Sequence, residues 1–334
     1  MTSPSSPDSP RRGPGSRRKQ RIDDLAASDG GTTTVTEAGA IEDTGGVGLI
    51  GSAWKRLRRN PAFLIGLTIT SLFVVLAIFS PWIAPHDPAR WLLEGKVSPQ
   101  SNPVPGPEAG HPLGADDKGR DLLSRLIVGS RQTLMVGVIA TIGGFTGGLV
   151  LGTLAGAFGG WVDALIMRMV DVMLSIPSLL LAVSIAALAA EPSQWTVIIA
   201  VGIVQVPIFA RLLRGSMLAQ RSKDHVLAAR ALGVKRSAIV LRHMLPNSLG
   251  PVIVQATLVL ATAIIDAAAL SYLGLGLPDD RVPEWGQMLG NAQDYFNGYP
   301  HLAFYPAACI VVVALGFTLM GESLREALDP KSRR

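Results

Sequence analysis

Long apolar runs alternate with short polar segments over most of this chain. The runs cover approximately residues 62–85, 133–158, 170–190, 194–214, 249–275 and 302–320. An apolar stretch of about 18 residues or more can cross the roughly 30 Å hydrocarbon core of a bilayer as a helix. A helix also satisfies its own backbone hydrogen bonds in lipid, which an open sheet cannot do. The pattern therefore predicts an all-α polytopic membrane protein with six transmembrane helices.

The polar segments between the runs set the domain limits. Residues 1–52 are rich in Ser, Pro, Gly, Thr and charge, so a disordered cytoplasmic tail is expected there. Residues 86–130 are expected to form an external loop that ends in an amphipathic helix lying in the membrane interface. The first span and this loop make an N-terminal segment, residues 53–130. Residues 131–328 would form the transmembrane domain, and residues 329–334 a second cytoplasmic tail.

Prolines and glycines add detail to the spans. Residues 161–168 are expected to form a short cytoplasmic turn, and Pro177 is expected to kink the third span. Glycines recur every four residues in the second span, which predicts close packing of that helix face against another helix. Glycine is also simply frequent in membrane helices, which is the alternative explanation. The repeat consists of Gly144, Gly148, Gly152, Gly156 and Gly160.

Charge places the segments on the two sides of the membrane. The chain has 30 Lys and Arg against 25 Asp and Glu, and 16% of its residues are charged. Soluble domains carry about 25%. Bases gather beside the apolar runs, as at residues 54–59 and 331–334, so the positive-inside rule predicts an inner (cytoplasmic) membrane protein with both termini in the cytoplasm. Trp195 and Trp285 are expected to anchor at the membrane–water interface. This distribution predicts contact with membrane lipid and no nucleic-acid partner.

The segment between the fourth and fifth spans, residues 211–246, holds eight bases and one acid, so it is expected in the cytoplasm. Asp224 or Ser222 can cap a short helix there. Gly233 stands where that helix should end in a left-handed turn. A second short helix is expected to follow and to end before Pro246, where the chain returns to the membrane. Two short helices joined by a glycine turn would make a compact knob that fits a partner's groove.

Three polar side chains within the spans are candidates for a pathway or gate. Asp266 either lines a pathway or forms a helix–helix hydrogen bond after protonation, because an intramembrane carboxylate costs about 2.5–3.5 kcal/mol on insertion scales. Gln205 could equally line the pathway or bond between helices. Asp171 is the third candidate, although an ion pair with Arg168 at the membrane boundary is favoured.

The sequence indicates no catalytic, metal or cofactor site. The single cysteine, Cys309, lies in an apolar run, and His225 and His243 lack the spacing of a metal site. The nearest match to a phosphate-binding loop, at residues 114–119, lacks the lysine and hydroxyl residue that such a loop uses. The chain is therefore not expected to be an enzyme.

The segment from Asp224 to Asn247 resembles the EAA loop of bacterial ATP-binding-cassette (ABC) importer permeases. That loop reads Glu-Ala-Ala, three residues, Gly, nine residues, Ile, one residue, Leu-Pro. Leu227 and His243 replace its acidic residue and its isoleucine. Residues 111–134 and 266–278 further resemble the C-type permease subunit of the dipeptide, oligopeptide and nickel transport family. The likeness covers residues 50–330, and the EAA positions that match are Ala228, Ala229, Gly233, Leu245 and Pro246.

The resemblance implies a type I (MetI-like) permease core with one extra N-terminal helix. It implies that residues 221–247 form a coupling loop that docks into a separate ATPase subunit. The implied partners are a second homologous permease subunit, one or two ABC ATPase subunits that use ATP and Mg, and an external substrate-binding protein or lipoprotein. The implied cargo is a di- or oligopeptide. The coupling residues by this resemblance are Asp224, Ala228, Ala229, Arg230, Gly233, Arg242, His243, Leu245 and Pro246.

Other functions stay open at this point. A permease of the same family could carry nickel or another small solute. An ATP-independent secondary transporter would often have an internal inverted repeat, and no clear repeat is seen in the sequence. A membrane scaffold or receptor without transport is a further alternative. Reconstitution with and without nucleotide separates these classes.

Overall fold

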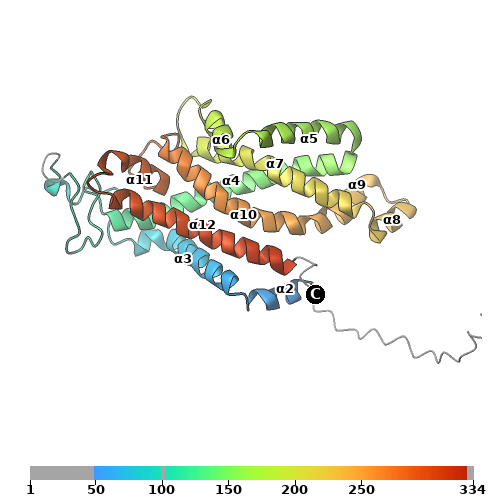
Figure 1. The fold of residues 1–334 in the computed structure, drawn as a ribbon, viewed down its shortest axis with the longest axis horizontal. Helices are drawn as coiled ribbons and strands as arrows, with labels where there is room; N and C mark the ends of the chain where they lie inside the picture. The colour runs from blue at the N-terminus through green and yellow to red at the C-terminus, as the bar shows by residue number, and fades with distance from the viewer. Residues whose placement is uncertain (1–48, 99–102, 329–334) are drawn as a thin grey trace, which may run out of the picture. The chain divides into compact units, whose positions relative to one another are not determined.

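The computed structural model describes residues 49–98 and 103–328, and most of these are helical (Figure 1). The predicted tails fall outside the described residues, except that residues 49–52 belong to a helix. No strand longer than a single bridge occurs in the described part of the chain. The prediction of an all-α protein is therefore confirmed for these residues.

The described residues contain a series of α-helices and a few shorter helical turns. The shorter turns are 3-10 helical at Glu94–Lys96 and Gln293–Tyr295 and π-helical at Ile239–Met244. The helices are α2 (Leu49–Leu57), α3 (Pro61–Ile83), α4 (Leu122–Phe158), α5 (Gly160–Ser175), α6 (Ser178–Ala186), α7 (Gln194–Gln220), α8 (Asp224–Ala231), α9 (Arg236–Ala238), α10 (Leu245–Tyr272), α11 (Trp285–Asn291) and α12 (His301–Leu328).

Within residues 49–98 and 103–328, five helical segments are long and apolar enough to cross a membrane. They are α3, α4, α7, the continuous run from Arg236 to Tyr272, and α12. The pair α5 and α6 passes the same test only when taken together, and it is bent by 96°. The predicted six spans are obtained if this bent pair counts as one span.

The third predicted span is broken where Pro177 follows Ile176. Proline has no backbone N–H, and its ring excludes the helical conformation for the residue before it. Accordingly Ile176 and Pro177 are both extended, and α6 starts in a new direction at Ser178. The predicted turn at residues 161–168 is wrong, because α5 already begins at Gly160. The chain reverses direction at Gly159, which has a φ of 66°, a value that glycine adopts at little cost.

The predicted interface helix before the second span is also wrong as a separate element. Its residues form the first turns of α4, which is capped by Asp121 and continues without a break for 37 residues. Leu122 and Leu126 are 1% and 8% exposed, so they face the protein core and not the lipid surface. At 1.5 Å per residue α4 is about 55 Å long, so it extends well beyond a hydrocarbon core of about 30 Å.

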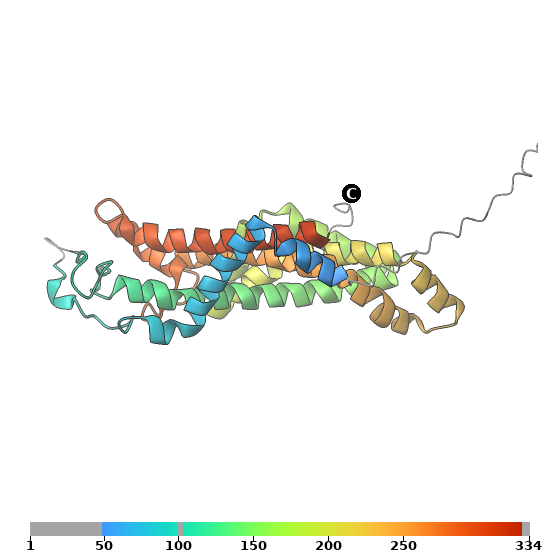
Figure 2. The same ribbon diagram turned by 90° about the horizontal axis from the view of Figure 1, so that it is seen from below.

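The bundle is built around the contact of α4 with α7, which is the most extensive in the fold. The helix α10 packs against both of them and against α12, while α3 lies along α12 and α4 (Figure 2). Many large apolar side chains of α3 are exposed, among them Leu72 at 56% and Ile78 at 58%. An apolar surface of this extent is typical of contact with lipid or another subunit. The helix α3 thus lies beside a core made of α4, the α5–α6 pair, α7, α10 and α12.

Candidate functional site

A short helical knob, residues 221–247, joins α7 to α10 at one end of the bundle (Figure 1). Its helix α8 begins after Lys223, which makes no side-chain cap. The predicted capping by Asp224 or Ser222 is therefore wrong. Asp224 is instead the first residue of α8, where its negative charge suits the positive end of the helix dipole.

The helix α8 ends in the predicted left-handed turn at Gly233, which has φ of +73°. The N–H of Gly233 donates to the carbonyl of Arg230 at 3.0 Å, and the N–H of Val234 donates to that of Ala229 at 3.1 Å. These two bonds form a Schellman motif, which satisfies carbonyls left free at a helix end. The turn therefore requires a residue that adopts positive φ at low cost.

The predicted second helix does not end before Pro246. After the single turn of α9, a π-helical turn leads directly into α10, so residues 236–272 form one continuous helical run. Pro246 lies in the first turn of α10. Pro246 directly follows the π-helical turn, in which the backbone hydrogen-bond pattern is already shifted, and proline has no N–H that would need a partner there.

The knob shares a buried cluster with α7 and α10 and has an exposed surface with leucines and bases. Val226 and Ala229 are buried against a cluster that includes Ile239 and Met244. On the outside, Leu232 is 82% exposed. Exposed apolar side chains in such a group favour contact with a partner. Leu227 and Leu241 are also exposed.

The residues predicted to couple this knob to a partner lie together on it. Ala229 is buried, and His243 and Leu245 are half-buried. The exposed members are Asp224, Ala228, Arg230, Gly233, Arg242 and Pro246.

Two arginines tie the knob to the end of α4. Arg221 donates from Nη2 to the carbonyls of Gly156 and Ala157 at 2.6 and 3.3 Å. Arg236 donates from Nη2 to those of Ala157 and Phe158 at 2.6 and 3.0 Å. The last carbonyls of a helix lack intrahelical partners and carry partial negative charge, so guanidinium groups stabilise them. The sequence alone did not predict this role of the two bases, because their partners lie in a distant part of the chain.

The four glycines predicted to pack within the second span face α7. A Cβ at Gly148 would lie 2.3 Å from the Cβ of Phe209, and one at Gly144 would lie 2.7 Å from the Cβ of Gln205. Gly152 and Gly156 lie equally close to α7. The fifth glycine of the repeat, Gly160, is the first residue of α5, and a Cβ added there would meet no atom within 4 Å in the rest of the described chain. The knob is thus fixed to α4, and the glycines of α4 let the side chains of α7 pack directly on its backbone.

The three polar candidates for a pathway or gate are not brought together. Gln205 is 3% exposed between α7 and α4, and neither polar atom of its amide is hydrogen-bonded within the described residues. Asp266 lies on α10 and is partly exposed. Asp171 of α5 is exposed and pairs with Arg211 of α7, so the predicted pair with Arg168 is wrong.

At the opposite end of the bundle, two buried arginines join three segments. Arg120 and Arg125 are each 1% exposed. Arg120 donates to Asp116 Oδ2 at 2.7 Å and to the carbonyl of Asp280 at 2.9 Å. Arg125 donates to the carbonyls of Pro88 and Asp280, both at 3.0 Å. The network holds the chain after α3, the start of α4 and the segment before α11 together, and its arginines belong to the segment quoted for the family resemblance.

Trp285, the first residue of α11, is part of the protein core beside this network. It is fully buried, packs edge-on against Phe73 with ring centroids 5.6 Å apart, and donates from Nε1 to the carbonyl of Leu126 at 3.0 Å. The prediction of an interface anchor is therefore wrong for Trp285, whereas Trp195 is 63% exposed and stays a candidate. Glu284 caps α11, and burial raises the pKa of its carboxyl although backbone N–H groups bind it.

Comparison with known proteins gives two matching family models. The model described as "Binding-protein-dependent transport system inner membrane component" matches residues 148–334. The model described as "N-terminal TM domain of oligopeptide transport permease C" matches residues 48–102.

Curated relatives match over most of the chain. The dipeptide transport system permease protein of Alkalihalophilus pseudofirmus is 43% identical over 84% of this chain and 90% of its own length. The di/tripeptide transport system permease protein of Pseudomonas aeruginosa is 41% identical, over 83% and 91% of the two chains. The probable D,D-dipeptide transport system permease protein of Escherichia coli is 41% identical, over 83% and 90%.

A solved structure supports the same fold. An inward-facing conformation of the MetNI methionine ABC transporter has a chain that aligns with a TM-score of 0.50 at 20% identity, over 61% of this chain and 96% of its own. The chain described above therefore belongs to the family of inner-membrane components of binding-protein-dependent transport systems, the permease subunits of ABC importers.

Proposed function

We propose that this permease subunit lines, together with a second permease subunit, a path through which di- or oligopeptides enter the cell. The observation that carries the proposal is the basic knob at residues 221–247, which is fixed by Arg221 and Arg236 to the glycine-packed pair of α4 and α7. A separate ATPase subunit would dock on the knob. Because the knob is bonded to α4 and α4 packs closely on α7, a displacement of the knob would move both membrane helices. The peptide cargo is supported by relatives named as dipeptide and di/tripeptide permeases.

The proposed orientation places the knob in the cytoplasm. Its bases outnumber its acids, as the positive-inside rule expects. The end that carries α11 and the arginine network then faces outward, where a substrate-binding protein or lipoprotein would deliver the peptide. Both chain termini would lie in the cytoplasm. One or two separate ATPase subunits would bind ATP and Mg and contact the knob through its exposed leucines and through Arg230 and Arg242.

The polar side chains within the bundle take different roles in this proposal. Gln205 is enclosed between α7 and α4, so a helix contact suits it better than a pathway. Asp266 is partly exposed on α10, and a carboxylate in a membrane helix usually faces water or a partner. We therefore assign Asp266, rather than Gln205, to the pathway or to the contact with the second permease subunit.

Substitution of Gly233 by valine tests the docking role. A side chain at φ of +73° costs about 1–2 kcal/mol, which disfavours the docking-competent knob by a factor of roughly 5–30. Co-purification of the ATPase and uptake of a labelled dipeptide should both fall. Gly250→Val is the matched control, because Gly250 lies in α10 with no described atom within 4 Å of an added Cβ. Full ATPase yield and full uptake in Gly233→Val would contradict the proposal.

Removal of the two anchoring arginines tests transmission separately from docking. In Arg221→Ala/Arg236→Ala the exposed leucines are unchanged, so the ATPase should still bind. The knob is no longer held on the end of α4, and uptake per ATP hydrolysed should fall at least about tenfold, since each lost charged hydrogen bond contributes roughly 1.5–3 kcal/mol. The control Lys223→Ala/Lys235→Ala removes the same charge from exposed positions. Equal uptake per ATP hydrolysed in the two double variants would show that Arg221 and Arg236 do not couple ATP hydrolysis to transport.

The cargo is tested by uptake in a strain that lacks this chain. Restoration of labelled dipeptide uptake by the wild-type gene supports the peptide assignment. Restoration of ⁶³Ni uptake without dipeptide uptake would replace it with the alternative cargo of the family.

A further inference from the structure

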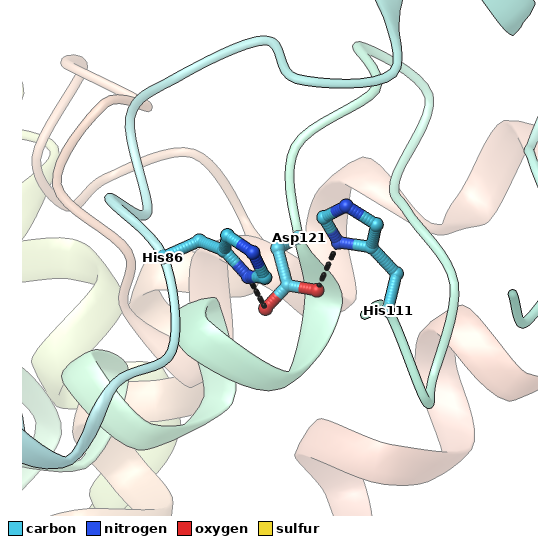
Figure 3. A group of neighbouring side chains, drawn as sticks. All are labelled: His86, His111 and Asp121. Atoms are coloured by element: carbon cyan, nitrogen blue, oxygen red, sulfur yellow. Dashed lines mark hydrogen bonds and ion pairs between the residues drawn. The ribbon is translucent and has the colours of Figure 1, made fainter. Parts of the chain in front are cut away.

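Two histidines and an aspartate lie together at the end of the bundle that carries α11. His86 follows the end of α3, His111 lies in the long loop, and Asp121 is the cap of α4. In Figure 3 the two imidazole rings lie on either side of the Asp121 carboxylate, each turned toward one of its oxygens. One ligand atom from each residue lies within 4.8 Å of the others. The sequence predicted no metal site here, because the two histidines lie 25 positions apart and no known spacing links them.

The three side chains are joined by one hydrogen bond and one longer ion pair. The Nδ1 of His111 lies 2.8 Å from Oδ1 of Asp121, and the Nδ1 of His86 lies 3.7 Å from Oδ2. Ligand atoms about 2.0–2.1 Å from a tetrahedral zinc ion lie roughly 3.3–3.4 Å apart. A bound zinc ion would replace the His111 hydrogen bond and lengthen that contact, and it would shorten the His86 contact, each by about half an ångström. The longer of the two observed distances, from His86, exceeds the length of a hydrogen bond.

One ring nitrogen in the group lacks a partner. The Nδ1 of His86 is buried, and no residue in the described chain forms a hydrogen bond with it. The two rings are stacked with centroids 4.4 Å apart and planes at 26°. The neutral imidazole is the form that binds a metal. A cation between the two rings and the Asp121 carboxylate would accept the lone pair of the His86 Nδ1 and neutralise the charge of the carboxylate.

The surroundings hold the carboxylate in place and leave one side open. Oδ2 of Asp121 accepts the backbone N–H of Ser124 at 2.8 Å, and the Ser124 hydroxyl accepts the backbone N–H of His86 at 3.0 Å. Such bonds orient metal ligands. The side chain of Asp121 is fully buried, while that of His86 is 30% exposed, so an ion would reach the site past His86.

We propose that His86, His111 and Asp121 form a zinc site that fastens the outer loop to the start of α4. Imidazole nitrogens with one carboxylate oxygen suit Zn²⁺, and three protein ligands leave a fourth position for water. The ion would join the chain leaving α3, the middle of the loop and the cap of α4. Its binding should therefore raise the thermal stability of the folded chain.

The test uses the full chain in detergent, stripped with EDTA, repleted with ZnCl₂ and freed of excess metal. Elemental analysis should find one zinc per chain, and zinc should raise the melting temperature. X-ray absorption at the zinc edge should show two imidazole ligands. Asp121→Asn is the most informative variant, because asparagine still caps a helix but lacks the anionic ligand. It should weaken zinc binding at least about 100-fold, since loss of a group that only orients a ligand already costs about 10- to 100-fold.

Two further variants make the result decisive. His86→Ala removes a ring nitrogen that has no hydrogen bond, so the chain should fold and lose the zinc. His301→Ala removes a histidine from the start of α12, outside this group, and should keep one zinc per chain. Less than about one zinc in ten wild-type chains after repletion, or equal zinc in His86→Ala, Asp121→Asn and His301→Ala, would overturn the proposal.

Discussion

Gly148→Ala is expected to separate α4 from α7 and to abolish transport, although it adds a single methyl group. The added Cβ would lie 2.3 Å from the Cβ of Phe209 and 2.9 Å from the carbonyl of Val206. Neither neighbour can give way, because the Cβ is fixed to the backbone of α7 and the carbonyl belongs to that backbone. Overpacking of a core in this way costs about 1–3 kcal/mol and occasionally more. The melting temperature of the purified chain and dipeptide uptake in cells measure the loss.

Gly143→Ala is the matched control for this substitution. Gly143 lies on the same helix five residues earlier, and no described atom lies within 4 Å of an added Cβ. Alanine is favoured over glycine in a helix by about 0.8–1.0 kcal/mol, so this variant should be neutral or slightly stabilised. Replacement of glycine by alanine should thus destabilise the chain at position 148 and leave it unchanged or slightly stabilised at position 143. If Gly148→Ala melts and transports like Gly143→Ala, the close approach of α4 and α7 does not determine stability.

Some features of the fold depend only on residues that are close together in the sequence. The apolar runs predicted the helices, and the glycine repeat lies on one face, because spacing along a helix fixes which residues share a face. Gly233 ends α8 as predicted, since a left-handed turn depends only on residues next to it in the chain. These features follow from neighbouring residues, so the sequence alone was sufficient for them.

The wrong predictions concern features that depend on distant parts of the chain. The first turns of α4 have an amphipathic pattern that fits an interface helix equally well, and their burial comes from packing against α10 and α11. Trp285 looked like an interface anchor because its partner Phe73 belongs to α3, near the other end of the sequence. The arginine network and the histidine pair were missed for the same reason. Their chemistry depends on which loops meet, and a single sequence carries no periodic signal for that.

Arg120→Met is expected to lower the free energy of unfolding by roughly 1–3 kcal/mol, because Asp116 loses a buried hydrogen-bond partner and, among the described side chains, keeps only its ion pair with Arg125 at 3.3 Å. Arg120 is 1% exposed and contacts Asp116 and Asp280. Methionine keeps much of the volume but provides no donor for Asp116 or for the carbonyl of Asp280. The loop between α3 and α4 should then detach from the segment before α11. The control is Arg281→Met, because the Arg281 side chain is 73% exposed and an ion pair at such a position contributes about 0–1 kcal/mol.

Acid titration separates the electrostatic part of this effect from lost packing. Burial alone would raise the pKa of the Asp280 carboxyl, but the hydrogen bond from Lys118 and the charge of Arg120 outweigh it and hold that pKa below its ordinary value. A carboxyl with a lowered pKa in the folded state adds stability above the unfolded pKa of about 3.9, and this stability is lost as the pH falls further. In Arg120→Met the pKa of Asp280 is lowered less, so melting temperature should fall less steeply below about pH 4 than in wild type. If Arg120→Met has a lower melting temperature at neutral pH but the same dependence of melting temperature on pH below about pH 4 as wild type, the effect is due to packing. Arg120 would then stabilise the fold by filling space and not through its charge.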